Sequence, residues 1–288
     1  MTATSHPLPR DQLEAISTTD INDAIPADEL AAALATPPFI VSPLLNLRDM
    51  GHIPGCSIAP GRIYRCAKLG DDEATKQWLS ANVTKVFDLR GRREVTSAPD
   101  PAADNVQNVW LATEGEHRKL VLDGFEEGDG SPGWKKQYLY IAAQYRPTFR
   151  AVLEHLHDSP DDPILFHCTA GRDRTGILAG MLHHLAGTDE PDVLYDYMLS
   201  RIGLEPGRDM LHKAIITAWN VSDPNNVAFK NVASIRPTFF TSFVDGINEV
   251  YGGWDGYFTS HLGFTETQLE RIRSNLRGGG AVDTESRL

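Results

Sequence analysis

The sequence predicts an α/β fold with a central, largely parallel sheet flanked by helices, followed by an extra helical region. Short apolar runs alternate with stretches of helical periodicity, an order typical of parallel sheets covered by helices. The 288 residues can bury a sizeable core, and 41% hydrophobic with 23% charged residues is ordinary for a globular protein. Together these observations favour one α/β domain over a disordered or repetitive chain.

Three strands are expected in the middle of the chain. Residues 84–89 form a short apolar run that ends in a charged turn, and residues 106–111 form a second candidate strand. Ile164, Leu165 and Phe166 follow Pro163 and form the third. Such short apolar runs bounded by polar turns are typical of buried strands.

Helices are expected around these strands. Apolar side chains recur at threes and fours from residue 134 to 157, which predicts one helix there. Residues 123–133 are rich in glycine and acidic side chains and are expected to form a mobile loop. The stretch 175–185 is expected to be helical, and residues 190–277 mostly helical, with two helices before Asn220 and one near 236–250. This is more helix than the sheet needs for cover, so 190–250 is a candidate lid.

The two ends of the chain differ from its centre. Residues 1–35 are polar, with an alanine-rich helical run that Pro37 and Pro38 stop, and we expect an N-terminal arm there. Residues 278–288 are small and polar and are expected to be a disordered tail. Residues 36–277 are then expected to form a single domain.

The charge and the cysteines limit the possible partners. With 27 basic and 39 acidic side chains the net charge is −12, which argues against nucleic acid and anionic membranes as partners. One local cationic pocket can still bind a small anion. No apolar run reaches the ~18 residues of a membrane span, and we expect no signal peptide. Three scattered cysteines do not suit a disulfide framework or a zinc cluster, so a reducing cytoplasm is expected.

The most informative segment is His167-Cys168-Thr169-Ala170-Gly171-Arg172-Asp173-Arg174-Thr175-Gly176. A cysteine ends a buried strand, and an arginine follows after five residues, where a helix begins. The backbone N–H groups of such a loop and the helix N-terminus attract an anion, and a guanidinium binds two phosphate oxygens at once. The same field favours the thiolate of a cysteine, which can then attack phosphorus. Thr169 to Arg174 are therefore the predicted phosphate-binding residues, and Cys168 and Arg174 the predicted nucleophile and anion binder.

Other cysteine chemistries fit this loop less well. Rhodanese-like sulfur transferases have a shorter loop that does not end in Arg-Thr-Gly, and nothing around Cys168 resembles the local pattern of papain-like proteases. Cys168 could instead be a small buried hydrophobic residue. That interpretation does not explain why a histidine, a glycine, a threonine and two arginines occur at these positions of the same strand–loop–helix junction. No metal and no cofactor is needed for this chemistry.

The segment resembles the P-loop of protein tyrosine phosphatases, Cys-x5-Arg-(Ser/Thr). The surrounding sequence resembles the atypical tyrosine phosphatase family of bacteria and fungi, which includes tyrosine, dual-specificity and phosphoinositide phosphatases. The similarity extends from about residue 36 to 277. It implies a tyrosine-phosphatase-like fold and a cysteine-dependent phosphatase. The stretches that carry it outside the P-loop are 46–51, 61–69, 87–90, 251–257 and 261–264.

Three positions depart from the family pattern. Arg172 stands where a lysine is usual, Cys66 replaces a serine, and His52 replaces a glycine. A planar guanidinium in place of an ammonium bears on substrate preference. Arg172 would suit a multiply phosphorylated substrate, or it serves the packing of the loop.

Two aspartates are candidates for the general acid that protonates the leaving group. Asp173 lies in the P-loop itself, and Asp88 ends the strand 84–89. We favour Asp173 because it is held beside the nucleophile, where a bound phosphate favours its protonated form. The alternative for Asp88 is an ion pair with Arg90 or Arg174.

The remaining candidate residues are assigned supporting roles. His167 is expected to orient the loop, and Thr175 to stabilise the sulfur as it leaves phosphorus. Arg48, Asp49 and Arg65 form either a supporting polar network or a buried ion pair. The pair His183 and His184 is expected to be structural, because it has no ligand-type neighbours at metal spacing. The helically spaced aromatics Phe239, Phe240 and Phe243 are expected in the core, with the alternative that they line a lid formed by residues 190–250.

The sequence thus predicts a metal-independent phosphomonoester phosphatase that forms a phosphocysteine. A tyrosine or dual-specificity phosphatase comes first, with a phosphorylated protein as substrate. The alternatives are a small-molecule phosphatase, acting on phosphoinositides or on a metabolite phosphate or diphosphate, and an inactive phosphate-binding module.

Overall fold

The computed structural model describes residues 7–115, 124–219, 223 and 225–279. Its centre is a five-stranded sheet with the order β1-β2-β5-β3-β4. The strands are β1 (Arg48–Asp49), β2 (Ile63–Cys66), β3 (Lys85–Asp88), β4 (Gln107–Trp110) and β5 (Ile164–His167). β1 is antiparallel to β2, and the other three pairings are parallel. The predicted α/β fold with a largely parallel sheet is confirmed.

The three strands expected from the sequence are present as β3, β4 and β5. β1 and β2 were not expected as strands, because β1 consists only of Arg48 and Asp49, and β2 has four residues with Arg65 between Tyr64 and Cys66. Arg48, Asp49 and Arg65 are nevertheless buried in the structure. Their charges are paired inside the protein, as described below, so the hydrophobic pattern gives no signal for these strands.

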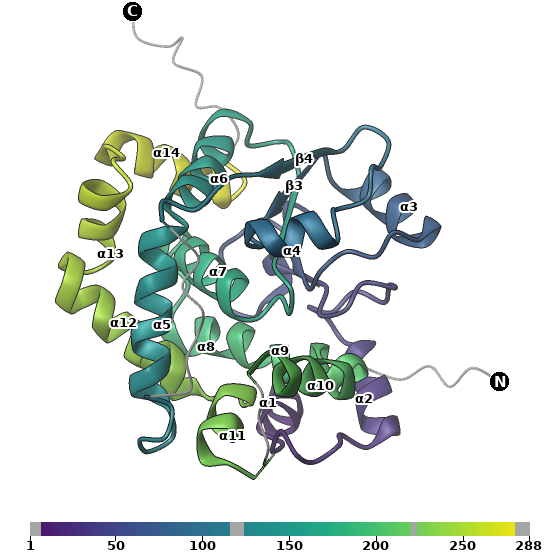
Figure 1. Cartoon of the computed structure of the whole chain (residues 1–288). Coiled ribbons are helices and arrows are strands. Elements are labelled where there is room, and N and C mark those ends of the chain that lie inside the picture. Colours follow the sequence, from purple (N-terminus) through teal and green to yellow (C-terminus); the bar gives the residue numbers. More distant parts are fainter. Residues whose placement is uncertain (1–6, 116–123, 220–222, 224, 280–288) are drawn as a thin grey trace, which may run out of the picture.

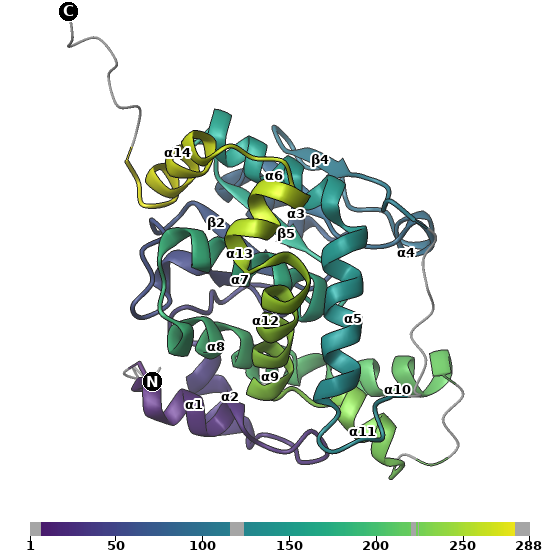
Figure 2. The same cartoon turned by 90° about the vertical axis from the view of Figure 1, so that its left-hand side faces the viewer.

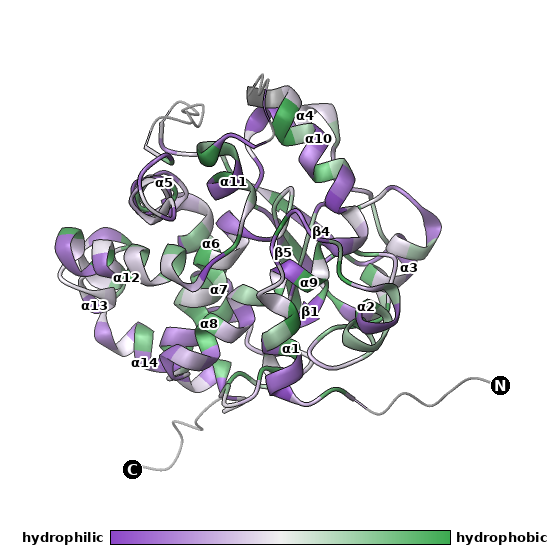
Figure 3. Cartoon of the chain, turned by 90° about the horizontal axis from the view of Figure 1, so that it is seen from below, coloured by the Kyte–Doolittle hydropathy of each residue, from purple (hydrophilic) through white to green (hydrophobic). Residues whose placement is uncertain are grey.

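Helices cover the two faces of the sheet unequally (Figure 1). Leu165 of β5 and Val86 of β3 belong to a small core with Leu79 of α3 (Glu73–Asn82). Ile164, Phe166 and Phe87 belong to a larger core on the other face. This larger layer contains α5 (Ser131–Gln144), α6 (Arg146–Asp158), α7 (Asp173–Ala186), α12 (Pro237–Tyr251) and α14 (Glu266–Leu276). Figure 3 shows hydrophobic residues on β5 and α7 at the centre of the molecule.

The single helix predicted over residues 134–157 is wrong in one respect, because it is two helices. α5 ends at Gln144 and α6 begins at Arg146, with Tyr145 between them. Pro147 lies in the first turn of α6. A proline is tolerated there because its missing N–H has no partner in a first turn, whereas inside one long helix it would break a hydrogen bond. The loop expected at 123–133 also ends early, since α5 begins at Ser131.

The extra helical region after the P-loop helix is confirmed. It contains α8 (Glu190–Met198), α9 (Ser200–Gly203), the 3-10 turn η2 (Glu205–Gly207) and α10 (Arg208–Trp219), so three helices precede Asn220 instead of two. α11 (Val227–Ala233) follows, and α12 packs along α5 (Figure 2). Phe239, Phe240 and Phe243 on α12 are buried in the larger core, as expected.

Two helices precede the sheet where an arm was expected. α2 (Ala27–Leu34) corresponds to the predicted alanine-rich run, and α1 (Arg10–Ser17) was not expected. Leu13, Ile25 and Ala33 are buried together with Leu199 and Ile202. Residues 7–35 therefore pack onto α8 and α9. Of the predicted C-terminal tail, residues 280–288 lie outside the described part.

Short elements complete the fold. These are η1 (Met50–His52), α4 (Arg92–Ser97), α13 (Trp254–Gly256) and the π-helical turn η3 (Tyr257–His261). Among the described residues, no helix combines the length and the apolarity that crossing a membrane requires.

Candidate active site

The loop from Cys168 to Arg172 joins the end of β5 to the start of α7. Gly171 has a φ of +64°, and a Cβ there would lie 2.2 Å from the carbonyl oxygen of Cys66. Only glycine fits this close approach between the loop and β2. The loop therefore stays tight against the sheet, at the N-terminus of a 14-residue helix whose dipole favours an anion.

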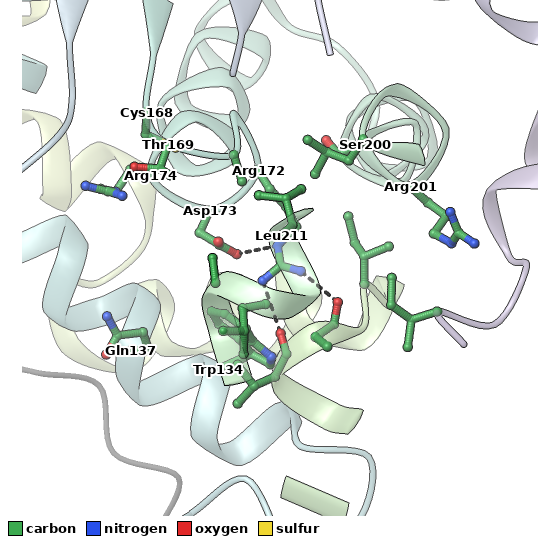
Figure 4. Close-up of a pocket in the computed structure, with 18 of the residues that line it drawn as sticks. Trp134, Gln137, Cys168, Thr169, Arg172, Asp173, Arg174, Ser200, Arg201 and Leu211 are labelled. Carbon is green, nitrogen blue, oxygen red and sulfur yellow. Dashed lines mark hydrogen bonds and ion pairs between the residues drawn. The ribbon is translucent and has the colours of Figure 1, made fainter. Parts of the chain in front are cut away.

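A cavity of about 470 Å³ opens over this loop. Cys168, Thr169, Ala170, Arg172, Asp173 and Arg174 line one end of it, and residues of α5, α9, α10 and α11 line the rest (Figure 4). Cys168 is only 2% exposed. The nucleophile predicted from the sequence thus lies at one end of the cavity, together with all the predicted phosphate-binding residues except Gly171.

Arg174 is held by an acidic side chain that the sequence did not single out. Its Nη1 donates to Oε2 of Glu94 at 2.6 Å, and its Nη2 donates to Oε1 at 3.0 Å. Glu94 also accepts hydrogen bonds from the amide of Gly91 at 2.7 Å and from the hydroxyl of Thr169. Burial opposes the charge on Glu94, but Arg174 and Thr169 lower its pKa to about 2. A carboxylate therefore occupies both terminal nitrogens of the guanidinium that is expected to bind phosphate.

Asp173 lies at the first residue of α7 and lines the cavity. Its Oδ1 accepts hydrogen bonds from the hydroxyl of Tyr138 at 2.8 Å and from Nε of Arg172 at 2.9 Å. Tyr138 also contacts the hydroxyl of Tyr197 at 2.7 Å, and burial raises the pKa of Tyr138 well above its ordinary value. The phenol is therefore a fixed neutral donor. No hydrogen bond to Oδ2 of Asp173 is found among the described residues, which leaves that oxygen for other partners.

Arg172 ties the P-loop to the end of α11. Nη1 donates to the carbonyls of Ala233 and Ser234 at 3.0 and 3.1 Å, and Nη2 donates to the carbonyl of Val232 at 3.1 Å (Figure 4). The guanidinium also lies 5.2 Å from the ring centroid of Trp134. Of the two roles open for Arg172, this geometry favours packing of the loop over binding of a second phosphate.

Asp88 lies apart from the cavity lining. It forms a bidentate pair with Arg90, whose Nε and Nη2 donate to its carboxylate at 2.8–3.1 Å. Arg90 also donates to Asp100, and Asp100 contacts Nε2 of His167 at 2.9 Å. The carboxylates of Asp88 and Asp100 and the ring of His167 lie close enough to share a metal ion. Arg90 already supplies a positive charge to both carboxylates, so we interpret this cluster as an ion-pair network behind the loop.

A second buried network holds the P-loop from the other side. Nη2 of Arg65 donates to the carbonyl of Gly171 at 2.9 Å, and the amide of Asn46 donates to the carbonyls of Ala170 and Gly171 at 3.2 and 3.1 Å. Arg65 and Arg48 both pair with Asp196 of α8, at 2.6 and 2.9 Å. The sequence proposed Arg48 and Arg65 for such a network but missed Asn46 and Asp196.

The other predicted residues have structural surroundings. Asp49 accepts hydrogen bonds from the amides of Gly51 and Gly61 at 2.9 and 2.7 Å and shapes the turn after β1. The hydroxyl of Thr175 is buried and has no hydrogen-bond partner among the described residues. His183 is buried and lies 3.4 Å from Asp196, whereas His184 stacks on Trp254. His183 also lies 3.4 Å from Sγ of Cys56, so it has a thiol and a carboxylate as neighbours that the spacing in the sequence did not predict.

Comparison with known proteins identifies the family of the chain. The model of a family described as "Tyrosine phosphatase family" matches residues 40–278. The chain is 27% identical over 238 residues to a tyrosine-protein phosphatase of Nostoc commune, covering 79% of each protein. It is 26% identical over 271 residues to the triple specificity protein phosphatase PtpB of Mycobacterium tuberculosis, covering 81% of this chain and 96% of that protein. The chain belongs to the tyrosine phosphatase family of cysteine-dependent phosphoric monoester hydrolases.

Proposed function

We propose that this phosphatase hydrolyses monoesters in which an aromatic or other apolar group carries a single phosphate, with phosphotyrosine in a protein as the leading candidate. The observation that carries the proposal is the lining of the cavity beyond the P-loop. Most of it is apolar and includes Ile21, Trp134, Ile141, Leu204, Leu211, Ile215, Val232 and Ile235. Burying a phenyl ring against such walls is favourable, whereas a polyol loses its hydration there without compensation.

The cations of the cavity support the same substrate class. Besides Arg174, the lining contains Arg172, Arg201 and Arg208. Arg172 is bonded to the carbonyls at the end of α11, and Arg201 and Arg208 are bonded to Glu205 and to backbone carbonyls of residues 19–23. A second phosphate would have to break these bonds. Multiply phosphorylated inositides and metabolite diphosphates are therefore the less supported alternative.

In the first chemical step, the thiolate of Cys168 attacks phosphorus, so that an S–P bond forms and the ester P–O bond breaks. Arg174 and the loop amides stabilise the charge on the equatorial oxygens. Binding of phosphate requires Arg174 to exchange at least one of its bonds to Glu94. Asp173 donates a proton from Oδ2 to the leaving oxygen, while Tyr138 and Arg172 hold Oδ1 in place.

In the second step, water attacks the phosphocysteine and Asp173 accepts its proton. The S–P bond breaks, and the sulfur leaves as a thiolate. The hydroxyl of Thr175 is assigned as a donor to that thiolate, because it is a buried donor without another partner among the described residues. We retain Asp88 only as an alternative acid, since its carboxylate is held by Arg90 outside the cavity lining.

The proposal also includes the bounds of the catalytic domain and the cellular compartment of the protein. Residues 36–277 form the catalytic domain, and the segment 190–250 covers the site, because α9, α10 and α11 all contribute to the cavity lining. A nucleophilic thiolate works best in a reducing compartment, which favours the cytoplasm. The net charge of −12 disfavours nucleic acid as a partner.

The test is turnover of a phosphotyrosine peptide, a phosphoserine peptide and a soluble phosphoinositide by the wild type and by Cys168→Ser. We expect cysteine-dependent release of phosphate, with the highest kcat/KM for phosphotyrosine. A higher kcat/KM for the phosphoinositide would overturn the assigned substrate class. Binding of phosphate without cysteine-dependent turnover would leave the inactive binding module as the function.

A further inference from the structure

Residues 18–25, between α1 and α2, contact α9 and α10, which line the active-site cavity. Arg201 of α9 donates from Nε to the carbonyl of Thr19 at 3.0 Å and from Nη2 to the carbonyls of Asp20 and Asp23 at 3.2 and 2.8 Å. These contacts involve three backbone carbonyls and one buried guanidinium. They fix the path of the segment regardless of its side chains.

Two more residues extend this contact. Nη1 of Arg208 lies 3.3 Å from the carbonyls of both Ile21 and Asn22. Glu205 accepts a hydrogen bond from the amide of Ile25 at 3.0 Å and pairs with both arginines. The carboxylate and the carbonyls thus bind two guanidiniums that line the active-site cavity, and Nε of Arg208 has no hydrogen-bond partner among the described residues.

Ile21 brings this segment into the cavity itself. Ile21 is among the residues that line the 470 Å³ cavity, together with Leu204 and Ile235. Ile21, Arg201 and Ile235 also line a second cavity of about 140 Å³. Ile21 therefore lies between the two cavities and lines both of them.

The segment is anchored at both ends. Leu13 of α1 and Ala33 of α2 are buried against α8 and α9, and Arg10 pairs with Asp192 and stacks on Tyr195. Residues 7–35, which include Arg10, Leu13, Ile21 and Ala33, lie outside the range 40–278 that matches the family model. We call residues 18–25, with Ile21 at the cavity, the wall. Because the wall lies outside the matched range, membership of the family does not by itself predict it.

We propose that the N-terminal segment 18–25 is a specificity-determining part of the active site. Ile21 contacts the part of the ester that lies beyond the phosphate-carrying ring, and the carbonyls of the segment keep Arg201 and Arg208 from binding a second phosphate. The inference rests on the proposed function, because it concerns the leaving group of the same reaction. The ligand that we expect to contact this segment is apolar and extends beyond one aromatic ring.

The test compares a short and a long ligand in the full-length protein. The substrates are phenyl phosphate and biphenyl-4-yl phosphate, and the variants are Ile21→Trp and Ile21→Ala. We expect Ile21→Trp to lower kcat/KM for the biphenyl ester at least tenfold and for the phenyl ester less than twofold, because the indole fills the space that the second ring needs. Ile21→Ala is expected to lower kcat/KM about fivefold for the biphenyl ester alone, through lost apolar contact.

Ile16→Ala is the matched control. Ile16 packs in the same N-terminal core and lines neither cavity. It should leave the ratio of the two substrates unchanged, and thermal melting of each variant reports whether it folds. Equal effects of both Ile21 substitutions on the two substrates, or none on either, would overturn the proposal.

A binding measurement separates this proposal from the proposed function. Calorimetric titration of Cys168→Ser with phenylphosphonate and biphenyl-4-ylphosphonate needs no turnover. If Ile21→Trp in this background weakens only the biphenyl ligand, the wall is established even when the wild type hydrolyses neither ester. If it weakens both ligands equally or neither, the wall is refuted even when the wild type is an active phosphatase.

Discussion

Replacing Asp196 by asparagine tests the most concentrated charge network in the described structure. The carboxylate is fully buried and pairs with Arg65 at 2.6 Å and Arg48 at 2.9 Å, and it lies 3.4 Å from His183. Burial opposes its charge, but the two arginines keep its pKa well below the ordinary value. Burial and the charge of Arg65 in turn lower the pKa of Arg48 to about 10. Asp196 is therefore the anion on which two buried cations depend.

The expected magnitude follows from this arrangement. Asparagine has almost the same volume, so the change leaves no cavity and the cost is electrostatic. Removing one partner of a buried ion pair costs about 3–5 kcal/mol, because the other charge stays buried and unpaired. For a domain of this size, each kcal/mol corresponds to about 2–4 °C in Tm. Asp196→Asn should therefore lower Tm by roughly 6–20 °C.

The assay is thermal unfolding with Asp161→Asn as the matched control. Asp161 pairs with Arg62 at 2.8 Å, but its side chain is 80% exposed, and exposed pairs contribute about 0–1 kcal/mol. The control should change Tm by less than about 4 °C. Adding Arg48→Met to Asp196→Asn should recover part of the loss, because one buried cation is then gone. If Asp196→Asn lowers Tm no more than the control does, the network does not stabilise the fold as argued.

Three further predictions concern the P-loop and its surroundings. Glu94→Gln should lower the Kd for inorganic phosphate by roughly threefold to tenfold, because the anion on Arg174 is gone, and should lower kcat through looser placement of the guanidinium; weaker phosphate binding measured by calorimetry would contradict this. Asp173→Asn should lower kcat about 100-fold or more for phenyl phosphate and far less for an ester of an acidic phenol, which needs little protonation; a wild-type rate on phenyl phosphate would exclude Asp173 as the acid. Burial opposes the charge on His183, but Asp196 and Cys56 raise its pKa to about 9, so its stabilisation is complete below pH ~6.5 and is lost as the pH rises through about 9. Denaturant titrations should then show a loss of at most about 3 kcal/mol over this interval, and a His183→Asn variant should show a flatter profile.

The part of the site that the sequence predicts is the part that is contiguous along the chain. The cysteine, the glycine with positive φ and the arginine all lie within one strand–loop–helix junction, where local backbone geometry determines which residues are required. Asp173 belongs to the same stretch, and its preference over Asp88 came from this proximity. The contacts of Asp88 with Arg90 agree with the alternative of a structural ion pair.

The missed residues reach the loop from distant parts of the chain. Glu94 is 80 residues from Arg174, and Asp196 is 131 residues from Arg65. Each is an ordinary acidic residue on a helix, and a single sequence does not distinguish it from solvent-exposed acids. Only Glu94 has a position that the sequence could have singled out. It is the N3 residue of α4, where an acidic side chain commonly caps the helix, and its carboxylate accepts a hydrogen bond from the amide of Gly91. The strands β1 and β2 were missed for a related reason, since both are short and contain buried arginines, Arg48 and Arg65, whose partner Asp196 is remote in the sequence.

The contacts of the arginines explain how a protein of net charge −12 can select a small dianion without attracting polyanions. Arg65 holds a P-loop carbonyl, Arg172 holds the end of α11, and Arg201 and Arg208 hold the N-terminal segment. Each of these guanidiniums is close to the substrate site, yet its hydrogen bonds are committed to the protein. Arg174 is different, because both of its terminal nitrogens donate to the two oxygens of one carboxylate, that of Glu94, and a phosphate can replace this carboxylate with the same bidentate geometry. Under the proposed function, affinity for an anion is therefore confined to Arg174 and the P-loop, and the apolar residues of the cavity select the group that carries the phosphate.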